Sequence, residues 1–277
     1  MYVMVRGINA ALTALFDAVC WPLRAAGPIW PLLALSLLAG VLMLWLFGKT
    51  SNQPRIRAVR DWIRGNMMAI RLYGDDLGLL FRLQGRILRA TVTYLRLALV
   101  PLLALIVPVL LILIQLNLRF ASRPLAPGEA TVVKVTLREG SARTAPVELE
   151  APAGVTVETP AVRVESLGEL AWRVRADAPG RHRLVVRAGG ETIHKELVAG
   201  HGWAAVSGKR TGEGVLDALL WPGEPPIERT SLVRAVEVRY ADLAISLFGW
   251  RLHWLLVFFV ASTAFGFAFR RVLGVEI

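Results

Sequence analysis

Two uncharged runs, one on each side of a strongly basic segment, constrain this chain more than any other feature of its sequence. Residues 25–48 and 97–118 contain no ionisable side chain and are 24 and 22 residues long. About 20 apolar residues in a helix, each rising about 1.5 Å, cross a hydrocarbon core roughly 30 Å thick. Both runs are therefore predicted to be transmembrane helices.

The segment between these runs predicts the orientation. Residues 49–96 carry ten basic and three acidic side chains, which is +7 of the formal net charge of +11. Basic residues beside a span are retained on the cytoplasmic side. Only four of the 32 basic residues are lysines, which is typical of a bacterial genome rich in G and C. We expect a protein of the bacterial inner membrane, with residues 49–96 in the cytoplasm and residues 1–23 and 119–251 outside it.

A third apolar run lies near the C-terminus. Residues 252–269 are 18 residues without Lys, Arg, Asp or Glu, and Arg270 and Arg271 follow them directly. These two arginines would stop the helix on the cytoplasmic side. The sequence thus predicts three transmembrane helices and a C-terminus inside the cell.

A thin polar stripe marks the apolar N-terminal segment, residues 1–23. Arg6, Asn9, Thr13 and Asp17 are spaced by three or four residues, which places them on one face of a helix. Only ten uncharged residues separate Arg6 from Asp17, too few to span a bilayer. We interpret the segment as an amphipathic helix lying in the membrane interface. A signal peptide and a tilted fourth span are the alternatives.

The basic segment, residues 49–96, has the pattern of a cytosolic helical hairpin. A Gly can end one helix and an Asp can begin the next at Gly74-Asp75-Asp76. Residues at three- and four-residue spacing predict the interface of a short antiparallel coiled coil. They are Ile56, Val59, Ile63, Met67 and Ile70, and then Leu77, Phe81, Gln84, Leu88, Val92 and Leu95. The second helix is expected to continue into the run 97–118.

Arginines follow one face of each predicted hairpin helix. They are Arg57, Arg60, Arg64 and Arg71 on the first helix, and Arg82, Arg86, Arg89 and Arg96 on the second. One interpretation is that they determine topology and bind anionic lipid headgroups. The other is that they bind an acidic or polyanionic partner such as the ribosome. DNA is not expected as a partner, because residues 119–242 are almost neutral, with 17 basic and 16 acidic side chains.

From about residue 124 the pattern changes to short alternating segments separated by Gly and Pro. Seven strands are predicted, at residues 130–138, 146–150, 154–158, 161–165, 170–175, 181–187 and 192–198. Together they predict an immunoglobulin-like β-sandwich over residues 122–202, outside the cytoplasm. The single Cys20 excludes an intramolecular disulfide, so the sandwich must be stabilised by its own core. Residues 203–251 are predicted to be a connector with an interfacial helix at 236–248.

The sequence contains no catalytic or metal-binding pattern. Its four histidines do not cluster with carboxylates at metal-ligand spacing, and there is no phosphate-binding loop, nucleophile elbow or zinc-protease motif. No acidic or basic residue lies inside a predicted span, whereas proton- and ion-coupled transporters usually need one. We therefore expect neither an enzyme nor a cofactor. Gln115, deep in the second run, is either an amide bonded to a neighbouring helix or one wall of a polar groove.

The order of these parts resembles the YidC-type insertase superfamily, in particular its minimal three-span members. Those have an external amphipathic helix, a first span, a basic cytosolic hairpin, a second span, and a third span that ends inside. The corresponding parts here are residues 1–23, 25–48, 49–96, 97–118 and 252–269. The resemblance implies a short polar groove open to the cytosol, through which apolar segments enter the bilayer without ATP. Bacterial members place an arginine in that groove; the nearest candidate here is Arg96, at its cytoplasmic mouth.

Two functions follow as expectations. The first is an insertase-like or chaperone-like factor of membrane-protein biogenesis, whose partners are lipids and client membrane proteins. The alternative is a non-catalytic subunit of a larger membrane complex that docks through its β-sandwich. Fixed stoichiometric partners would distinguish the subunit from an insertase, which binds its clients transiently.

Overall fold

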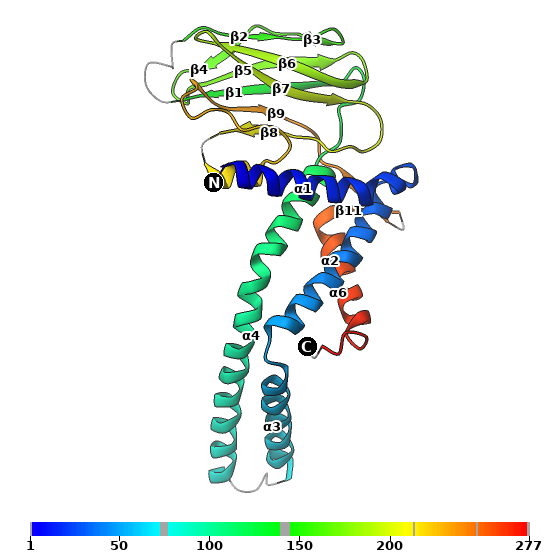
Figure 1. The fold of residues 1–277 in the computed structure, drawn as a ribbon, viewed down its shortest axis with the longest axis vertical. Coiled ribbons are helices and arrows are strands. Elements are labelled where there is room, and N and C mark those ends of the chain that lie inside the picture. Colours follow the sequence, from blue (N-terminus) through cyan, green and yellow to red (C-terminus); the bar gives the residue numbers. More distant parts are fainter. Residues whose placement is uncertain (1, 73–76, 139–144, 213, 248, 276–277) are drawn as a thin grey trace. The chain divides into compact units, whose positions relative to one another are not determined.

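The computed structural model of the chain describes residues 2–72, 77–138, 145–212, 214–247 and 249–275 (Figure 1). The chain divides into two compact units. The sandwich unit consists of Met1–Ala34 and Leu113–Val257, and the hairpin unit consists of Leu35–Ile112 and Phe258–Ile277. The result is a mixed fold of long helices and β-sheets.

The helices include two that can cross a membrane. Their bounds are Tyr2–Cys20 (α1), Trp21–Ala26 (η1, a 3-10 helix), Ile29–Thr50 (α2), Gln53–Leu72 (α3), Leu77–Phe120 (α4), Val215–Leu220 (α5) and Trp254–Phe269 (α6). Helix α2 and the Phe81–Phe120 part of α4 are long and apolar enough to span, by length and composition. Helix α6 has only 16 residues, because Leu252 and His253 belong to a strand. The third predicted span stays a prediction.

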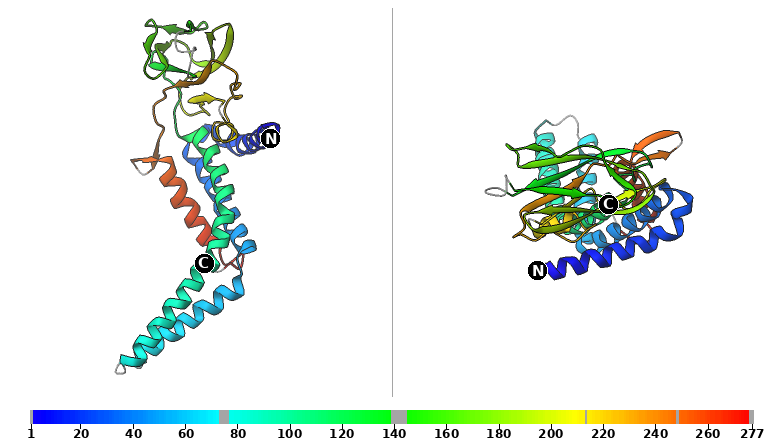
Figure 2. Two further views of the ribbon diagram at one scale, coloured as in Figure 1. Left: turned by 90° about the vertical axis from the view of Figure 1, so that its left-hand side faces the viewer. Right: turned by 90° about the horizontal axis from the view of Figure 1, so that it is seen from above.

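One helix of 44 residues, α4, joins the second half of the hairpin to the second apolar run. Pro101 and Pro108 lie inside this helix without ending it. The predicted continuity of hairpin and span is therefore confirmed. Helix α3 lies beside the first half of α4 in both views of the hairpin unit (Figure 1 and Figure 2). The predicted break at Gly74-Asp75-Asp76 lies outside the described residues.

The coiled-coil interface predicted for the second hairpin helix is wrong. Phe81 and Leu88 are 75% and 65% exposed, whereas Leu83 is 5% exposed. The buried and half-buried positions of α4 continue from Leu83 through Ile87 and Tyr94. Helix α4 carries apolar residues on two faces, so periodicity alone could not show which face is inward. On α3, Ile56 is buried as predicted, whereas Met67, predicted in the same interface, is 60% exposed, so that part of the prediction is wrong as well.

All seven predicted strands are present in the sandwich unit. They are Ala130–Leu137 (β1), Val147–Glu150 (β2), Val155–Val157 (β3), Val162–Val164 (β4), Glu169–Ala176 (β5), Gly180–Ala188 (β6) and Glu191–Ala199 (β7). The larger sheet has the order β3-β5-β1-β9-β8, in which β8 (Lys209–Thr211) and β9 (Val233–Val238) come from the connector, and β4 also pairs with β5. The smaller sheet has the order β2-β6-β7. Side chains of both sheets, among them Trp172 on β5 and Leu184 on β6, form one hydrophobic core.

The helix predicted at residues 236–248 is wrong, and so is the end of the sandwich at residue 202. The connector contains Lys209–Thr211 (β8), Val233–Val238 (β9), Ala244–Leu247 (β10) and Trp250–His253 (β11). Strand β9 pairs with β1, with Val236 opposite Val135. Val233, Val236 and Val238 are buried in the core, and β-branched residues favour strands. Pairing with the distant strand β1 therefore determines the structure here.

Candidate functional site

Arg119, near the C-terminal end of α4, is the centre of a polar cluster in the sandwich unit. It is 1% exposed. Its Nη2 donates to Asp17 Oδ1 at 2.8 Å and to the carbonyl oxygen of Thr13 at 2.9 Å. Its Nη1 donates to the side-chain oxygen of Gln115 at 2.7 Å, and its guanidinium lies over the ring of Phe16. These contacts fasten the end of α4 to α1.

Helix α1 turns the predicted polar stripe toward the protein. Asn9 is buried and donates from Nδ2 to the carbonyl oxygen of Ala218 in α5, at 2.8 Å. Asp17, two turns further along, accepts from Arg119. On the other side of α1, Ile8 and Leu15 are exposed. Asn9, Thr13 and Asp17 of the stripe therefore contact other parts of the same unit, and the helix presents an apolar face outward.

The two residues proposed for a polar groove, Gln115 and Arg96, have different surroundings. Gln115 is fully buried in the sandwich unit, where Nε2 donates to Thr13 Oγ1 at 3.2 Å and Oε1 accepts from Arg119. Arg96 is exposed and belongs to the hairpin unit. They lie 19 positions apart on α4, which is about 28 Å of helix. Gln115 therefore fits the interpretation of an amide bonded to a neighbouring helix, and the polar groove with Arg96 stays a prediction.

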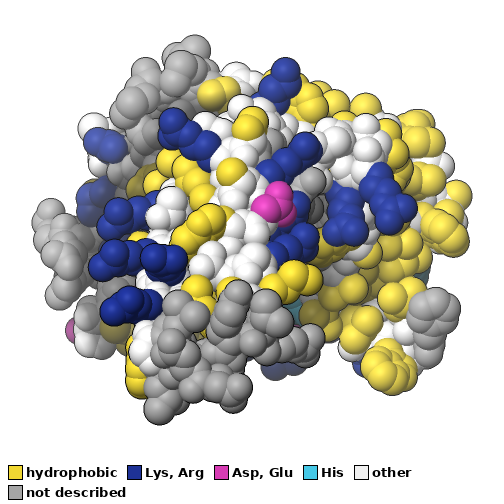
Figure 3. All heavy atoms as spheres, turned by 90° about the horizontal axis from the view of Figure 1, so that it is seen from below, with side chains coloured by type: hydrophobic (Ala, Val, Ile, Leu, Met, Phe, Trp, Pro, Cys, Tyr) yellow, Lys and Arg dark blue, Asp and Glu magenta, His cyan; other side chains and the backbone are white. Residues whose placement is uncertain are grey.

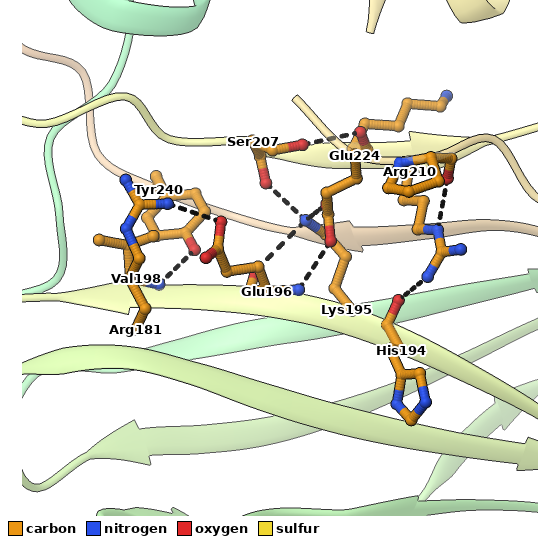
Figure 4. Close-up of polar contacts among 11 residues, drawn as sticks. Arg181, His194, Lys195, Glu196, Val198, Ser207, Arg210, Glu224 and Tyr240 are labelled. Atoms are coloured by element: carbon orange, nitrogen blue, oxygen red, sulfur yellow. Dashed lines mark hydrogen bonds and ion pairs between the residues drawn. The ribbon is translucent and has the colours of Figure 1, made fainter. Parts of the chain in front are cut away.

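Lys195 on β7 is the second buried charge of the sandwich unit (Figure 4). Its ammonium forms an ion pair with Glu224 and donates to the carbonyl oxygen of Ser207 at 2.6 Å. Glu224 Oε1 also accepts the backbone N–H of Glu196 at 2.7 Å. Burial lowers the pKa of Lys195, and the charge of Glu224 opposes that shift.

Further contacts bind the connector to β7 around this pair. Arg210 donates from Nε to the carbonyl oxygen of Pro225 at 2.7 Å and from Nη1 to the carbonyl of His194. The hydroxyl of Tyr240 accepts the N–H of Val198 at 3.0 Å, and burial raises the pKa of this tyrosine. Because these polar groups are bonded to one another, we interpret the cluster as a structural fastening of residues 207–240 to the sandwich.

The arginines predicted to bind a partner or headgroups lie on the hairpin unit. Arg57 and Arg64 on α3 are exposed and Arg60 is half-buried. The second set, Arg82, Arg86, Arg89 and Arg96, is exposed on α4. The side chain of Arg71 lies outside the described part of the structure. Figure 3, seen from the hairpin end, shows Lys and Arg side chains gathered on this face with little acidic side chain among them.

The described part of the hairpin unit has a basic hollow and an apolar one. The first is a cavity of about 450 Å³ at which Arg57, Arg60 and Arg64 meet Arg270 and Arg271. The second is an apolar cavity of about 340 Å³ between α2, α4 and α6. Its lining residues include Gly40 and Met43 of α2, Leu105 and Val109 of α4, and Phe259, Ser262, Thr263 and Gly266 of α6.

Close packing of α2 against α6 borders the apolar cavity. A Cβ atom at Gly40 would clash with the carbonyl oxygen of Ser262. Gly266 follows Ser262 by four residues, and a Cβ atom there would lie 3.8 Å from the carbonyl oxygen of Gly40, in ordinary contact. Small residues at this spacing let two apolar helices approach closely. The cavity is thus bounded by a tight α2–α6 contact and by the side of α4.

A cavity of about 700 Å³ in the sandwich unit lies between the end of α4, β1, β9 and the connector. Its charged lining is internally paired. Lys209 Nζ lies 2.8 Å from Glu237 Oε1, and Lys134 Nζ lies 3.5 Å from Glu237 Oε2. Lys209 also lies over the ring of Trp221. The charges of Lys134, Lys209 and Glu237 are therefore paired with one another at this cavity.

Sequence reasoning missed Arg119, Lys195 and Glu224. In the sequence, Arg119 is simply the first charged residue after the run 97–118. It also follows Gln115 by four residues, so the two side chains share one face of the helix. That spacing matches the spacing of Thr13 and Asp17 on α1 and could have indicated the contact. No sequence signal pairs Lys195 with Glu224, which lie 29 positions apart.

The described residues contain no group of three or more His, Cys, Asp or Glu side chains that could hold a metal ion. Comparison of the chain with protein-family models, with curated proteins and with solved structures finds no match.

Proposed function

We propose that this protein is a bacterial inner-membrane factor that helps apolar segments of other proteins enter the bilayer, as an insertase-like chaperone that uses no ATP. The observation that carries the proposal is the apolar cavity between α2, α4 and α6. Two of these helices are long and apolar enough to span a membrane. A cavity between such helices can accommodate apolar side chains of a client helix as it leaves water.

The open side of α4 supports the same proposal. In the most apolar window of α4 only 11% of the residues are buried, compared with 39% in α2. The apolar surface that remains must be covered by lipid or by another apolar helix. Helix α4 can therefore bind a client segment beside the cavity and release it sideways into lipid.

The remaining parts fit this orientation. With the basic hairpin in the cytoplasm, its arginines lie where a client chain or an acidic carrier arrives. The outward apolar face of α1 then lies in the interface on the opposite side of the membrane. The ion pair of the buried Arg119 with the half-exposed Asp17 fastens α1 to the end of α4.

An insertion assay tests the proposal. The full chain is reconstituted into vesicles of bacterial lipid, and insertion of a short single-span client is measured by protease protection. Thr263→Phe would fill the cavity from its α6 side, because Thr263 lines it. Ala264→Phe is the matched control, since Ala264 is exposed beside Thr263 but does not line the cavity. We expect insertion to fall with Thr263→Phe and not with Ala264→Phe. If empty vesicles insert the client as well as vesicles with the wild-type protein do, the proposal is contradicted.

A subunit of a larger membrane complex is the second candidate, and a row of exposed apolar side chains favours it. Phe81, Leu88, Val92 and Leu95 are exposed on α4, in the hairpin expected to be in water. Rows of this kind on a soluble helix mark protein-binding surfaces. Purification in mild detergent distinguishes the two candidates: a subunit retains partners in fixed stoichiometry, whereas an insertase does not.

A further inference from the structure

Five arginines from two distant parts of the sequence meet in one cavity of the hairpin unit. Arg57, Arg60 and Arg64 lie on one face of α3, at spacings of three and four residues, and Arg270 and Arg271 follow the end of α6. Together they line a hollow of about 450 Å³. Among the described residues that line it, none is acidic. Outside the lining, Asp61 forms an ion pair with Arg60 at the surface, with 4.0 Å between Oδ1 and Nε and a side chain that is 66% exposed.

The C-terminal turn gives Arg270 and Arg271 defined positions. After α6, the N–H of Val275 donates to the carbonyl oxygen of Arg270 at 3.1 Å, and the N–H of Gly274 donates to that of Arg271 at 3.3 Å. Gly274 has a φ of 62°. This is the Schellman arrangement, in which a glycine in the left-handed region ends a helix.

Packing of the next residue fixes this turn to α2. Val275 is 9% exposed. A Cβ atom at Gly48 of α2 would lie only 2.7 Å from Val275 Cγ2, so the valine side chain occupies the space that the glycine leaves. The two arginines are therefore held by a turn and an apolar contact, rather than by a free tail.

We propose that this cavity binds a phosphate-bearing anion, and that its ligand is the headgroup of an acidic phospholipid. Guanidinium groups suit phosphate because their planar N–H pairs donate to two oxygens at once. The cavity lies beside the C-terminal ends of α2 and α6, where an apolar helix meets a basic segment, and such a boundary is where headgroups are found. The choice of a lipid over soluble phosphate rests on the proposed membrane location.

Native mass spectrometry of the full chain in mild detergent measures this binding directly. Phosphatidylglycerol, phosphatidylcholine and inorganic phosphate are titrated separately, and the bound fraction gives an apparent Kd for each. We expect phosphatidylglycerol to bind at least about tenfold more tightly than phosphatidylcholine, because several basic side chains contribute. Millimolar inorganic phosphate should neither bind comparably nor displace the lipid. If it does both, the site takes soluble phosphate and the lipid assignment is overturned.

A triple variant and a matched control test the site itself. The triple variant Arg60→Gln, Arg270→Gln and Arg271→Gln should lose the preference for phosphatidylglycerol. The control removes three charges from the same hairpin outside the cavity, through Arg82→Gln, Arg86→Gln and Arg89→Gln, and should retain the preference within about twofold, since separated exposed charges are screened. Equal loss in both triple variants would mean diffuse attraction and would overturn the site.

A third variant keeps every charge and disturbs only the turn. Gly274→Val places a β-branched residue at a φ of 62°, which such residues rarely adopt. The preference should fall at least about fivefold if the folded turn positions the two arginines. Unchanged binding by this variant would overturn a built site. Elution volume in detergent and circular dichroism, compared with those of the wild-type chain, show that each variant is folded.

Discussion

The guanidinium of Arg119 and the carboxylate of Asp17 form an ion pair at 2.8 Å between residues 102 positions apart. Arg119 is 1% exposed at the side chain and Asp17 is 47% exposed. One charge is therefore removed from water, while its partner remains partly hydrated. Such a pair fixes geometry, because the buried cation requires its acceptors in place.

Asp17→Asn tests this relationship. The variant leaves the Arg119 charge buried without a full counter-charge, which should destabilise the sandwich unit by about 1–2 kcal/mol. The value is below that of fully buried pairs because Asp17 is half-exposed. Chemical unfolding of the full chain in detergent measures the change. Asp242→Asn, at an exposed position of the same unit, should have no comparable effect, and equal stability of wild type and Asp17→Asn would contradict the role of the pair.

The place of β9 in the larger sheet gives a second prediction. A fragment of residues 122–202 lacks β9, so β1 loses the partner that covers Val133 and Val135. We expect this fragment to aggregate or to melt without cooperativity. A fragment of residues 122–243 contains β8 and β9 and should show β-type circular dichroism and a cooperative transition. Cooperative folding of the shorter fragment would show that the sandwich does not need the connector.

The buried Lys195 predicts a dependence of stability on pH. Its pKa in the folded state is lowered below the ordinary 10.5 by burial. Between the folded and unfolded pKa values the unfolded chain binds more protons, so the free energy of unfolding rises with pH in that window. Lys195→Met should flatten this rise. The free energy of unfolding of the full chain is measured at alkaline pH below 10.0. Above that pH the raised pKa of Tyr240 lowers stability and would oppose the effect of Lys195.

Retention of the same slope by Lys195→Met would mean that another group titrates there. Glu224→Gln is the matched variant for the other half of the pair. It removes the charge that opposes the shift, so the pKa of Lys195 should fall further and the window should widen toward lower pH.

Orientation can be tested by cysteine labelling in a Cys20→Ala background. Gly65→Cys places a thiol on α3, where a Cβ meets nothing within 4 Å, and Arg183→Cys places one at an exposed position of β6. In intact cells a membrane-impermeant maleimide should label position 183 and should reach position 65 only after lysis. The opposite pattern would place the hairpin outside and would remove the basis of the proposed function.

Local sequence patterns were sufficient for much of the fold. The seven strands from β1 to β7 follow from alternation and from Gly and Pro turns, and the continuity of α4 follows from an unbroken helical pattern across Arg96. Both features are determined by neighbours in sequence. The immunoglobulin-like type of the sandwich, and the membrane location itself, stay predictions.

The errors arose where contacts between distant segments determine the structure. Strand β9 forms because Val236 pairs with Val135 of β1, about a hundred positions earlier, and nothing local distinguishes it from a helix. The inward face of α4 is selected by what packs against it, so Leu83 is buried although Phe81 is the larger apolar residue. The partners of Arg119 and Lys195 lie 102 and 29 positions away. Local spacing could indicate which face these residues occupy but not what they contact.

Site-specific photo-crosslinking at the apolar cavity tests the central claim most directly. A photoreactive amino acid replaces Thr263, which lines the cavity, or Ala264, which does not, in cells that synthesise an arrested membrane-protein chain. The account predicts light-dependent adducts between position 263 and the apolar segment of the arrested chain, and few or none from position 264. If position 263 instead gives one stable, stoichiometric partner, or no adduct to any arrested chain, the protein does not receive client segments at this cavity.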